Sequence, residues 1–563
     1  MIIGLDVGGT HTDVVLLDHN GLVRREKVLT DAKDLFHSVL KGLDTIMDGI
    51  DPGKVSRAVL STTLTTNAVV QDRVQPVGMI ITGGPGMDPE LYRTNSFYHI
   101  VSGAMDHRGR EIQPVNENEI RKIADSLKKE GISYVGVVGK FSARNPSHEL
   151  KIASLIEGIF DKVFLGHQSS GNLNFPRRIA TTYLNAAVYP VHKDFFEAVE
   201  KSLESKGLKI PMHILKADGG TMNFASSIDF PGQTIFSGPA ASVMGAMLAC
   251  PEKGDVLVFD IGGTTTDIAV LIDGVPVLEP LGIEIGPYKT LIRSLKTHSI
   301  GVGGDSVVRL HNNDITIGPD RIGPALAYGG PEVTPTDALF VLEKIEGGDR
   351  GLALKGIGAM AEKKGLSIED LSKEILEKTC YLILNEAGRM VDQINHKPVY
   401  TVHDVFEGYL MNPETILVLG GPAAYFSTWL SRVSDFTVKT VPEWGVANAI
   451  GAAIARTTSE VTVFADTERG VITSSEPNFK GSCTKSYSKE SAISDALGLL
   501  KEKVMRSGAK EEDFEMEVIE NSEFNMVRGF YTSGKNIRVK VQVKPGIISG
   551  YEKIGNKIST PMT

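Results

Sequence analysis

The stretch LVFDIGGTTTDIAVLID, residues 257–273, places an aspartate, two glycines, three threonines and a second aspartate between two apolar runs. A second copy, IGLDVGGTHTDVVLLD, occupies residues 3–18. In each copy the apolar runs predict two strands joined by the glycine turn, and Asn20-Gly21 or Asp273-Gly274 then predicts a turn into a third strand. Two copies of this device in one chain predict a duplicated fold that clamps a ligand between its halves.

The length and composition of the chain exclude several classes of protein. With 563 residues the chain is too long for one core, so we expect two or three domains. It has 59 basic and 69 acidic residues and no basic cluster, which argues against binding to nucleic acid or to an anionic membrane. Cys250, Cys380 and Cys483 are too far apart for a metal knuckle and favour a reducing compartment. No signal peptide and no apolar run near ~20 residues is visible, so we predict a cytoplasmic protein.

Alternating helix and strand patterns predict layered α/β domains along most of the chain. We expect Asn145 to cap a helix whose first residue is Pro146, and residues 184–207 to form a long helix. Residues 335–400 are predicted to form a helix-rich insertion. Residues 470–486 have the composition of a polar linker, and the helix and alternating strands after it predict a small α+β tail.

The glycine turns are suited to binding phosphate, because glycine lets several backbone N–H groups converge on one anion. An aspartate beside such a turn would repel bare phosphate, so Asp6 and Asp260 predict a divalent cation, Mg²⁺, held largely through water. The pair therefore indicates a metal-nucleotide. Asp13 and Asp267 could position the threonine hydroxyls of each loop or a water.

Three further segments complete this pattern. Gly420 and Gly421 form a strand-to-helix turn that would bring backbone close to a flat group such as adenine. The small residues of SGPAASVMGA (237–246) and GVANAIGAAIA (445–455) predict two helices that pack closely at a hinge.

The order of these five elements resembles the actin, sugar-kinase and Hsp70 ATPase superfamily over residues 1 to about 457. The resemblance implies an α/β fold, the duplicated, two-lobe, ribonuclease H-like fold of the actin-like ATPases, with ATP and Mg²⁺ as cofactors. The expected domains are an N-terminal lobe (1–175), a second lobe with the helical insertion (176–457) and a small α+β C-terminal domain (458–563).

Other segments are similar to the hydantoinase A and 5-oxoprolinase family, which includes N-methylhydantoinase A and acetone carboxylase beta-like chains. They are STTLTTNAVVQ (61–71), RNPSHE (144–149), RRIATTYLNAAVYP (177–190), DGGTM (218–222) and the segment from Ser299 to Ala338. The sequence departs from the family pattern in GVGGDS, which places Asp305 in a loop predicted to face the cleft, and in GGPAAYF, which lacks the usual histidine.

The family resemblance implies an ATP-dependent enzyme that phosphorylates the carbonyl of a lactam, hydantoin or related cyclic amide, so that water can open the ring. Relatives direct the same chemistry at ketones. It also implies a hydantoinase B-like partner subunit for ring opening, and a homo-oligomer is compatible with it. Two other functions stay open: an ATPase switch or reactivating factor acting on a protein partner, and a kinase for a small molecule.

The implied site residues fall into three groups. Asp6 and Asp260 would bind the metal, and Asp6, Asp13, Asn67, Asp260 and Asp267 are the candidate catalytic residues. The candidate nucleotide-binding residues are Gly8, Gly9, Thr10, Thr12, Gly262, Gly263, Thr264, Thr265, Gly303, Gly304, Gly420 and Gly421.

Several polar residues have two interpretations. Thr62, Thr63, Thr66 and Asn67 could contact substrate or the γ-phosphate, or form a hydroxyl network that caps a helix. His148 is expected to be solvated or capping, and His167, at a strand end, stays open. Arg177 and Arg178 could clamp an anion, but surface ion pairs are the commoner role.

Overall fold

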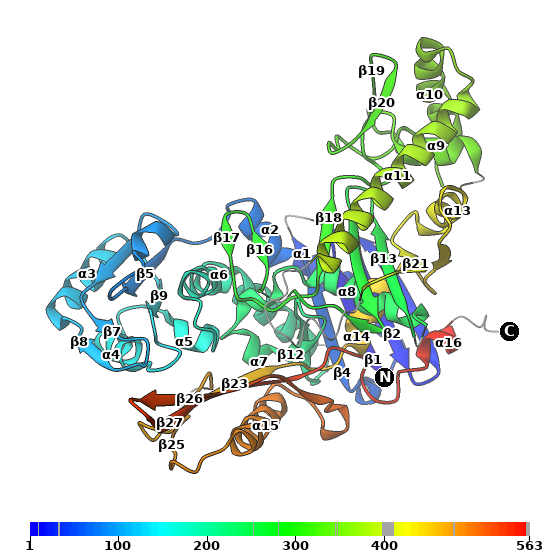
Figure 1. Cartoon of the computed structure of the whole chain (residues 1–563). Coiled ribbons are helices and arrows are strands. Elements are labelled where there is room, and N and C mark those ends of the chain that lie inside the picture. The colour runs from blue at the N-terminus through cyan, green and yellow to red at the C-terminus, as the bar shows by residue number, and fades with distance from the viewer. Residues whose placement is uncertain are drawn as a thin grey trace.

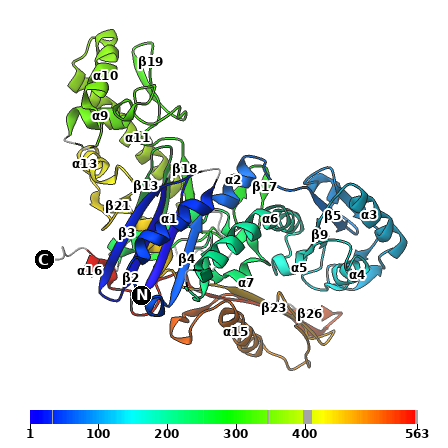
Figure 2. The same cartoon turned by 180° about the vertical axis from the view of Figure 1, so that it is seen from behind.

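The computed structural model describes residues 1–9, 11–31, 34–205, 207–251, 253–279, 281–343, 345, 347–396, 410–476 and 479–558. Figure 1 shows a central body of two sheets with three attachments, and Figure 2 shows the same arrangement from behind. The attachments are a helical arm, a small α/β unit and a third sheet. Among the described residues, no helix is both long and apolar enough to cross a lipid bilayer.

The first sheet of the body has the strand order β12-β11-β4-β1-β2-β3. Its strands are β1 (Ile2–Val7), β2 (His11–Asp18), β3 (Gly21–Leu29), β4 (Arg57–Thr62), β11 (Met212–Leu215) and β12 (Thr221–Asn223). The predicted turn at Asn20-Gly21 is confirmed, since Asp18 pairs with Gly21. β1 is antiparallel to β2 but parallel to β4, which is parallel to β11. The carboxyl ends of β1, β4 and β11 therefore share one sheet edge, where open α/β sheets bind ligands.

The second sheet repeats this arrangement around the second motif, in the order β15-β14-β13-β21-β22 with β18 beside β14. Its strands are β13 (Asp255–Ile261), β14 (Thr266–Ile272), β15 (Val275–Pro276), β18 (Thr297–Ile300), β21 (Thr415–Leu419) and β22 (Thr437–Thr440). β13 is antiparallel to β14 and parallel to β21, as β1 is to β2 and β4. The repeat in the sequence is thus also a repeat in topology.

Two helices of small residues lie between the sheets, α8 (Ser237–Ala246) and α14 (Ala447–Ile454). A methyl group on Gly451 would lie 2.3 Å from the Gly245 nitrogen, and one on Gly4 of β1 would lie 2.1 Å from the Ala449 carbonyl oxygen. Backbone meets backbone at these points, so only glycine fits. The predicted close packing of the two helices is confirmed.

The outer faces of the two sheets are covered by other helices. α1 (Leu35–Met47) and the second half of α6 (Phe175–Ser205) cover the first sheet, and Leu43 and Phe196 pack in its core. α6 begins nine residues before the predicted helix 184–207 and continues through Pro190. α13 (Ala423–Val433) and α11 (Ile368–Asn395) cover the second sheet.

The helical arm extends from the second sheet (Figure 1). It consists of α9 (Pro335–Leu342), α10 (Arg350–Lys364), the outer part of α11 and the hairpin of β19 (Val308–His311) and β20 (Asp314–Ile317). The helix-rich insertion predicted over 335–400 is confirmed as far as residue 396, and residues 397–400 lie outside the described chain.

The small α/β unit is built on a parallel sheet in the order β10-β9-β5-β6. Its elements are β5 (Val77–Thr82), β6 (Tyr98–Val101), β9 (Tyr134–Gly139), β10 (Lys162–Leu165), α3 (Glu117–Lys129), α4 (Ser147–Leu155), α5 (Gly166–Ser169) and the hairpin β7 (Ala104–Met105) and β8 (Glu111–Gln113). The start of α4 differs slightly from the prediction, because Pro146 is the N-cap and the Asn145 side chain accepts a hydrogen bond from the Ser147 nitrogen at 3.1 Å.

The third sheet, in the order β25-β24-β23-β27-β26, packs against α15 (Lys489–Arg506). Its strands are β23 (Glu460–Asp466), β24 (Val471–Ser474), β25 (Lys480–Ser482), β26 (Met516–Arg528) and β27 (Tyr531–Val543). The prediction of a linker over 470–486 is wrong. β24 and β25 lie there, since β24 pairs with β23 and β25 pairs with β24.

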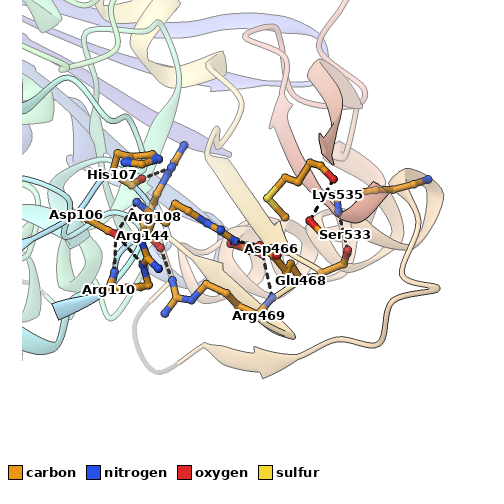
Figure 3. Close-up of polar contacts among 12 residues, drawn as sticks. Asp106, His107, Arg108, Arg110, Arg144, Asp466, Glu468, Arg469, Ser533 and Lys535 are labelled. Atoms are coloured by element: carbon orange, nitrogen blue, oxygen red, sulfur yellow. Dashed lines mark hydrogen bonds and ion pairs between the residues drawn. The ribbon is translucent and has the colours of Figure 1, made fainter. Parts of the chain in front are cut away.

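Polar contacts join the third sheet to the small α/β unit (Figure 3). Arg108, in the turn between β7 and β8, pairs with Asp466 at 2.9 Å and Glu468 at 2.6 Å. The Arg144 guanidinium lies over the Phe464 ring, 4.6 Å from its centroid. Further along, the chain returns to the body, where Tyr551 and the helix α16 (Ile554–Ile558) pack near α8 and β3.

Candidate functional site

The two glycine loops are equivalent in strand register. Asp6 on β1 lies opposite Asp13 on β2, and Asp260 on β13 lies opposite Asp267 on β14. Each loop therefore carries one carboxylate on either side of its base.

The turn inside each loop is closed by the same hydrogen bond. The Gly8 nitrogen donates to the His11 carbonyl at 3.0 Å, and the Gly262 nitrogen donates to the Thr265 carbonyl at 2.9 Å. The conformation that the sequence repeat predicts is thus common to both loops.

Asp260 is held by the two helices between the sheets. Its Oδ2 accepts hydrogen bonds from the Ser242 hydroxyl of α8 and from the Asn448 amide of α14, the latter at 3.2 Å. Burial raises the pKa of Asp260, and these two donors oppose the rise.

Asp6 has a more extreme environment. Burial, with the charge of Asp13 as the second cause, raises the pKa of Asp6 to about 7. The charge of Asp260 raises the Asp6 pKa further, while Ser61 and the same Asn448 side chain lower it. Asn448 therefore acts on both carboxylates, which places the two loops around one point at the ends of α8 and α14.

The donor set fits a magnesium ion bound mainly through water. Asp6 Oδ1 is buried and has no hydrogen-bond partner among the described residues, so a cation would satisfy it. No group of three His, Cys, Asp or Glu side chains in the described chain is placed to hold a metal. Mg²⁺ commonly takes only one or two carboxylates and completes its shell with water and phosphate, so the pair Asp6 and Asp260 suffices.

The second carboxylate of each loop differs between the copies. Asp13 forms an ion pair with Lys27 at 2.5 Å, and although burial raises the Asp13 pKa, Lys27 opposes the rise. Burial and the charge of Asp260 raise the pKa of Asp267 to about 7, with only Ser299 lowering it.

Glycines leave room at two points around the loops and are closely packed at a third. A methyl group on Gly9 or on Gly421 would meet no atom within 4 Å, so backbone faces open space there. Gly420 has φ +99, and a methyl group on it would lie 2.5 Å from an Asp260 carboxylate oxygen. The third glycine turn is therefore packed against the second loop.

The segment Gly303-Gly304-Asp305 also lies against the second loop. The Gly304 nitrogen donates to the Gly262 carbonyl at 2.9 Å, and the Asp305 nitrogen donates to the Gly263 carbonyl at 2.7 Å. The Asp305 carboxylate is paired with Arg321 at 3.1 Å.

The threonines of the loops are not equivalent. Thr10 lies outside the described residues. Thr12 is fully buried and its hydroxyl is 2.9 Å from that of Thr30, so its side chain does not face the open side of the loop, contrary to the phosphate contact that we expected. Thr264 is exposed and Thr265 is partly buried, so both stay available.

The threonine-rich segment forms α2 (Leu64–Val70), whose N-cap, Thr63, lies beside the end of β1. The Thr62 hydroxyl accepts from the Leu64 nitrogen at 3.1 Å, and the Thr66 hydroxyl accepts from the Phe236 nitrogen at 2.8 Å. This is the hydroxyl network that we considered as the alternative. Asn67 is exposed and donates to Thr63 at 3.3 Å.

Both histidines are in the small α/β unit rather than at the loops. His148 is buried and its Nε2 lies 2.9 Å from Glu111, so a solvated role is wrong. His167 is buried in α5, and its Nδ1 lies 2.5 Å from the fully buried Glu149. Burial alone would raise the Glu149 pKa, but His167 and Arg178 hold it below the usual value.

The expectation of surface ion pairs fails for Arg178. Its side chain is fully buried and donates to the Ser142 hydroxyl at 2.7 Å and to the Gly139 carbonyl at 2.9 Å. Arg177 is half-buried and pairs with Glu284 at 3.3 Å.

Sequence reasoning missed Ser242 and Asn448. Asn448 is the one polar residue of the helix ANAIGAAI, and Ser242 faces Asp260 from an otherwise small-residue helix. A polar residue such as Asn448 in a helix otherwise made of small and apolar residues could have indicated a functional role from the sequence.

Fold and site together define an α/β protein with duplicated glycine-aspartate loops on either side of two closely packed helices. The chain belongs to the hydantoinase/oxoprolinase family: the model named Hydantoinase/oxoprolinase matches residues 178–461, and that of its N-terminal region matches residues 2–160.

Similar proteins include subunits of two named enzymes. The caprolactamase subunit alpha of Pseudomonas jessenii is 24% identical over 479 residues, which cover 78% of this chain and 68% of that protein. The acetone carboxylase beta subunit of Xanthobacter autotrophicus is 24% identical over 437 residues, covering 67% of this chain and 60% of that protein. The crystal structure of the ATP-dependent caprolactamase from Pseudomonas jessenii has the same fold, with a TM-score of 0.72, 20% identity, and coverage of 97% of this chain and 87% of that chain.

Proposed function

We propose that the protein is an ATP-dependent enzyme that transfers a phosphoryl group to the carbonyl oxygen of a lactam, hydantoin or related cyclic amide. Transfer forms a bond from the carbonyl oxygen to the γ-phosphorus and breaks the bond from that phosphorus to the oxygen of ADP. Water then adds to the activated carbon, and the ring C–N bond breaks as the nitrogen takes a proton. A second water hydrolyses the resulting acyl phosphate and releases phosphate. One observation carries the proposal: the glycine loops present Asp6 and Asp260 to one point, where Asn448 acts on both. Similarity to a caprolactamase subunit supports the choice of a cyclic amide.

The fold that we propose for this chemistry is the two-lobe fold of actin-like ATPases. Residues 1–175 would form the first lobe, 176–457 the second, and 458–563 a C-terminal domain. The two closely packed helices, α8 and α14, would form the hinge across which the lobes close on ATP.

The loops would bind the nucleotide through their backbone. We assign the β- and γ-phosphates to the N–H groups of Gly8, Gly9, Gly262 and Gly263 and to the hydroxyls of Thr264 and Thr265, where glycine lets the anion approach. Asp6 and Asp260 would hold Mg²⁺, which neutralises charge on the phosphates.

Other residues would surround the bound nucleotide and the substrate. The open space over Gly421 would take the adenosine, and Gly303 and Gly304 would form the wall beside the second loop. Asp13 and Asp267 would orient water or a hydroxyl, and Asn67, exposed in the middle of α2, would reach the substrate. Ring opening would use a hydantoinase B-like partner subunit, consistent with relatives that are named as subunits.

The experiment that tests the proposal measures ATP hydrolysis by the purified chain against ε-caprolactam, hydantoin, 5-oxoproline and acetone, with and without a candidate partner subunit. We expect one class of cyclic amide to stimulate hydrolysis severalfold or more. Stimulation by acetone, with none by the cyclic amides, would identify ketones as the substrates in place of cyclic amides. Turnover that no small molecule changes, with or without the partner subunit, would overturn the proposal in favour of an ATPase switch.

A further inference from the structure

A crevice of two connected chambers lies at the end of β11, where the body meets the third sheet. The inner chamber has a volume of about 60 Å³ and the outer chamber about 350 Å³. The chambers share the lining residues Gln168, Lys216, Phe230, Gln233, Ser459 and Lys503. None of the glycine-loop residues lines either chamber, so the crevice is distinct from the nucleotide site described above.

The crevice nevertheless lies on the same sheet edge as Asp6. Lys216 directly follows β11, and β11 is separated from β1 by β4 alone. With about 4.8 Å between neighbouring strands, the axes of β11 and β1 are roughly 10 Å apart. The strand ends that carry Asp6 and Lys216 are therefore neighbours on one sheet edge.

Two conspicuous sequence segments converge on the inner chamber without a role in the glycine loops. DGGTM (218–222) contributes Asp218, and RRIATTYLNAAVYP (177–190) contributes Thr181 and Asn185. The backbone of the first segment is forced into place, because Gly219 has φ +76 and a methyl group on Gly220 would lie 2.0 Å from the Thr458 hydroxyl oxygen.

Arg293 in the inner chamber has unused hydrogen-bond donors. Its Nε and Nη1 are buried and have no hydrogen-bond partner among the described residues. Its Nε lies 3.5 Å from Asp218, which already accepts from Lys216, from the Thr458 hydroxyl at 2.8 Å and from the Gly220 nitrogen at 3.0 Å. Its Nη2 donates to the Val543 carbonyl at 3.4 Å, so Nη1 is the free end of the guanidinium. A buried guanidinium with a spare N–H group is suited to a carboxylate, because hydrogen bonds between these two charged groups are strong.

The rest of the lining matches a small organic molecule. Asn185 uses its Oδ1 to accept from the Gly232 nitrogen at 2.8 Å, which leaves its Nδ2 as a donor toward the chamber. Phe230 and Ile292 supply apolar surface. A carboxylate group fits the inner chamber, because its volume of about 60 Å³ is several times the roughly 10–15 Å³ that one water needs. The outer chamber is in the range of small-molecule sites.

We propose that this crevice binds a small organic carboxylate, with its carboxylate group in the inner chamber against Arg293. The carboxylate could belong to the compound whose carbonyl is phosphorylated or to a separate effector. Binding itself does not depend on the proposed function, because it needs neither ATP nor turnover.

The test is calorimetric titration of the full nucleotide-free chain with three probes of similar size. Cyclopentanecarboxylate has the carboxylate alone, 5-oxoproline has carboxylate and cyclic amide, and 2-pyrrolidinone has the amide alone. We expect both carboxylates to bind at least tenfold more tightly than 2-pyrrolidinone. Equal affinity for the neutral and anionic probes, or no binding of either carboxylate at 20 mM, would overturn the proposal.

Variants locate the bound carboxylate. Arg293→Gln is expected to weaken carboxylate binding at least tenfold, and Arg293→Lys to restore part of it. Arg506→Gln is the matched control, because this arginine lines the outer chamber but is 60% exposed and already paired with Glu476. Equal weakening by both glutamine variants would place the ligand elsewhere. Circular dichroism melting identifies any variant that fails to fold, in which case the wild-type probe series decides.

The two sources of the carboxylate are separated by kinetics. If it belongs to the substrate, Arg293→Gln raises KM for 5-oxoproline at least tenfold and leaves KM for a neutral lactam unchanged. If it belongs to an effector, cyclopentanecarboxylate changes ATP turnover with a neutral lactam. Carboxylate binding in a protein that activates no carbonyl compound would refute the proposed function and leave this site in place.

Discussion

The first glycine loop leaves a buried oxygen of Asp6 without a partner, whereas in the second loop Ser242 and Asn448 both donate to Asp260. The turns themselves have the same hydrogen bond and the same pairing of aspartates. Duplication has thus kept the backbone, while the partners of the carboxylates have diverged. The carboxylate of the second loop is held by two side chains of the protein, whereas that of the first loop keeps one oxygen without a hydrogen-bond partner among the described residues.

The largest expected effect is on ATP turnover. Asp6→Asn and Asp260→Asn should each reduce kcat for ATP hydrolysis at least about 1000-fold, because each removes a carboxylate that holds the metal at the transferring phosphate. Asp273→Asn is the matched control, since this aspartate ends the second hairpin and its Oδ1 accepts from the Gly254 nitrogen, a bond that asparagine retains. Normal turnover in either folded loop variant would remove that residue from the metal site.

The second effect separates the loops by stability. Because the pKa of Asp6 is raised from 3.8 to about 7, the folded protein retains a proton that the unfolded chain releases at lower pH. This destabilisation is absent below about pH 4, grows as pH rises and is complete above about pH 7, where it amounts to roughly 4 kcal/mol.

Asp6→Asn should therefore raise the free energy of unfolding of the metal-free protein above that of the wild type at pH 8, and by much less at pH 5. Urea unfolding of both proteins at the two pH values measures this difference. Asp260→Asn should raise the free energy of unfolding less, because Ser242 and Asn448 oppose the rise in the Asp260 pKa and because asparagine satisfies these two hydrogen bonds less well than the carboxylate. If the free energy of unfolding changed with pH in the same way in wild type and in Asp6→Asn, the pKa of Asp6 would not be raised in the folded protein.

The sequence repeat predicted the backbone of both loops, since glycine turns and apolar strands are local signals. The small residues of α8 and α14 predicted the close packing of these two helices. The burial of Thr12 and of His148 could not be predicted, because each depends on a residue elsewhere in the chain. The hydroxyl of Thr12 meets that of Thr30, and His148 meets Glu111. The linker prediction failed for a similar reason: β24 is a strand through its pairing with β23, and β25 through its pairing with β24.

The third effect concerns the helix that carries Asn448 to both loops. Gly451→Ala should destabilise the protein by about 1–3 kcal/mol, because its methyl group would meet the Gly245 backbone nitrogen at 2.3 Å. Gly388→Ala in α11 is the control, since a methyl group there meets no atom within 4 Å and should stabilise by about 0.5–1 kcal/mol. Thermal melting of both variants measures the difference, and equal melting temperatures would contradict the backbone contact.

The smallest effect tests the ion pair that distinguishes the first hairpin. Lys27→Met should cost less than about 1 kcal/mol, because Lys27 is 44% exposed and such pairs are weak. It should also shift the pH profile of ATP turnover to higher pH, since Lys27 holds down the pKa of Asp13. Lys296→Met, which removes a pair with Glu279 outside the loops, is the control for stability alone. If Lys27→Met left the pH profile of ATP turnover unchanged, the charge of Asp13 would have no part in turnover.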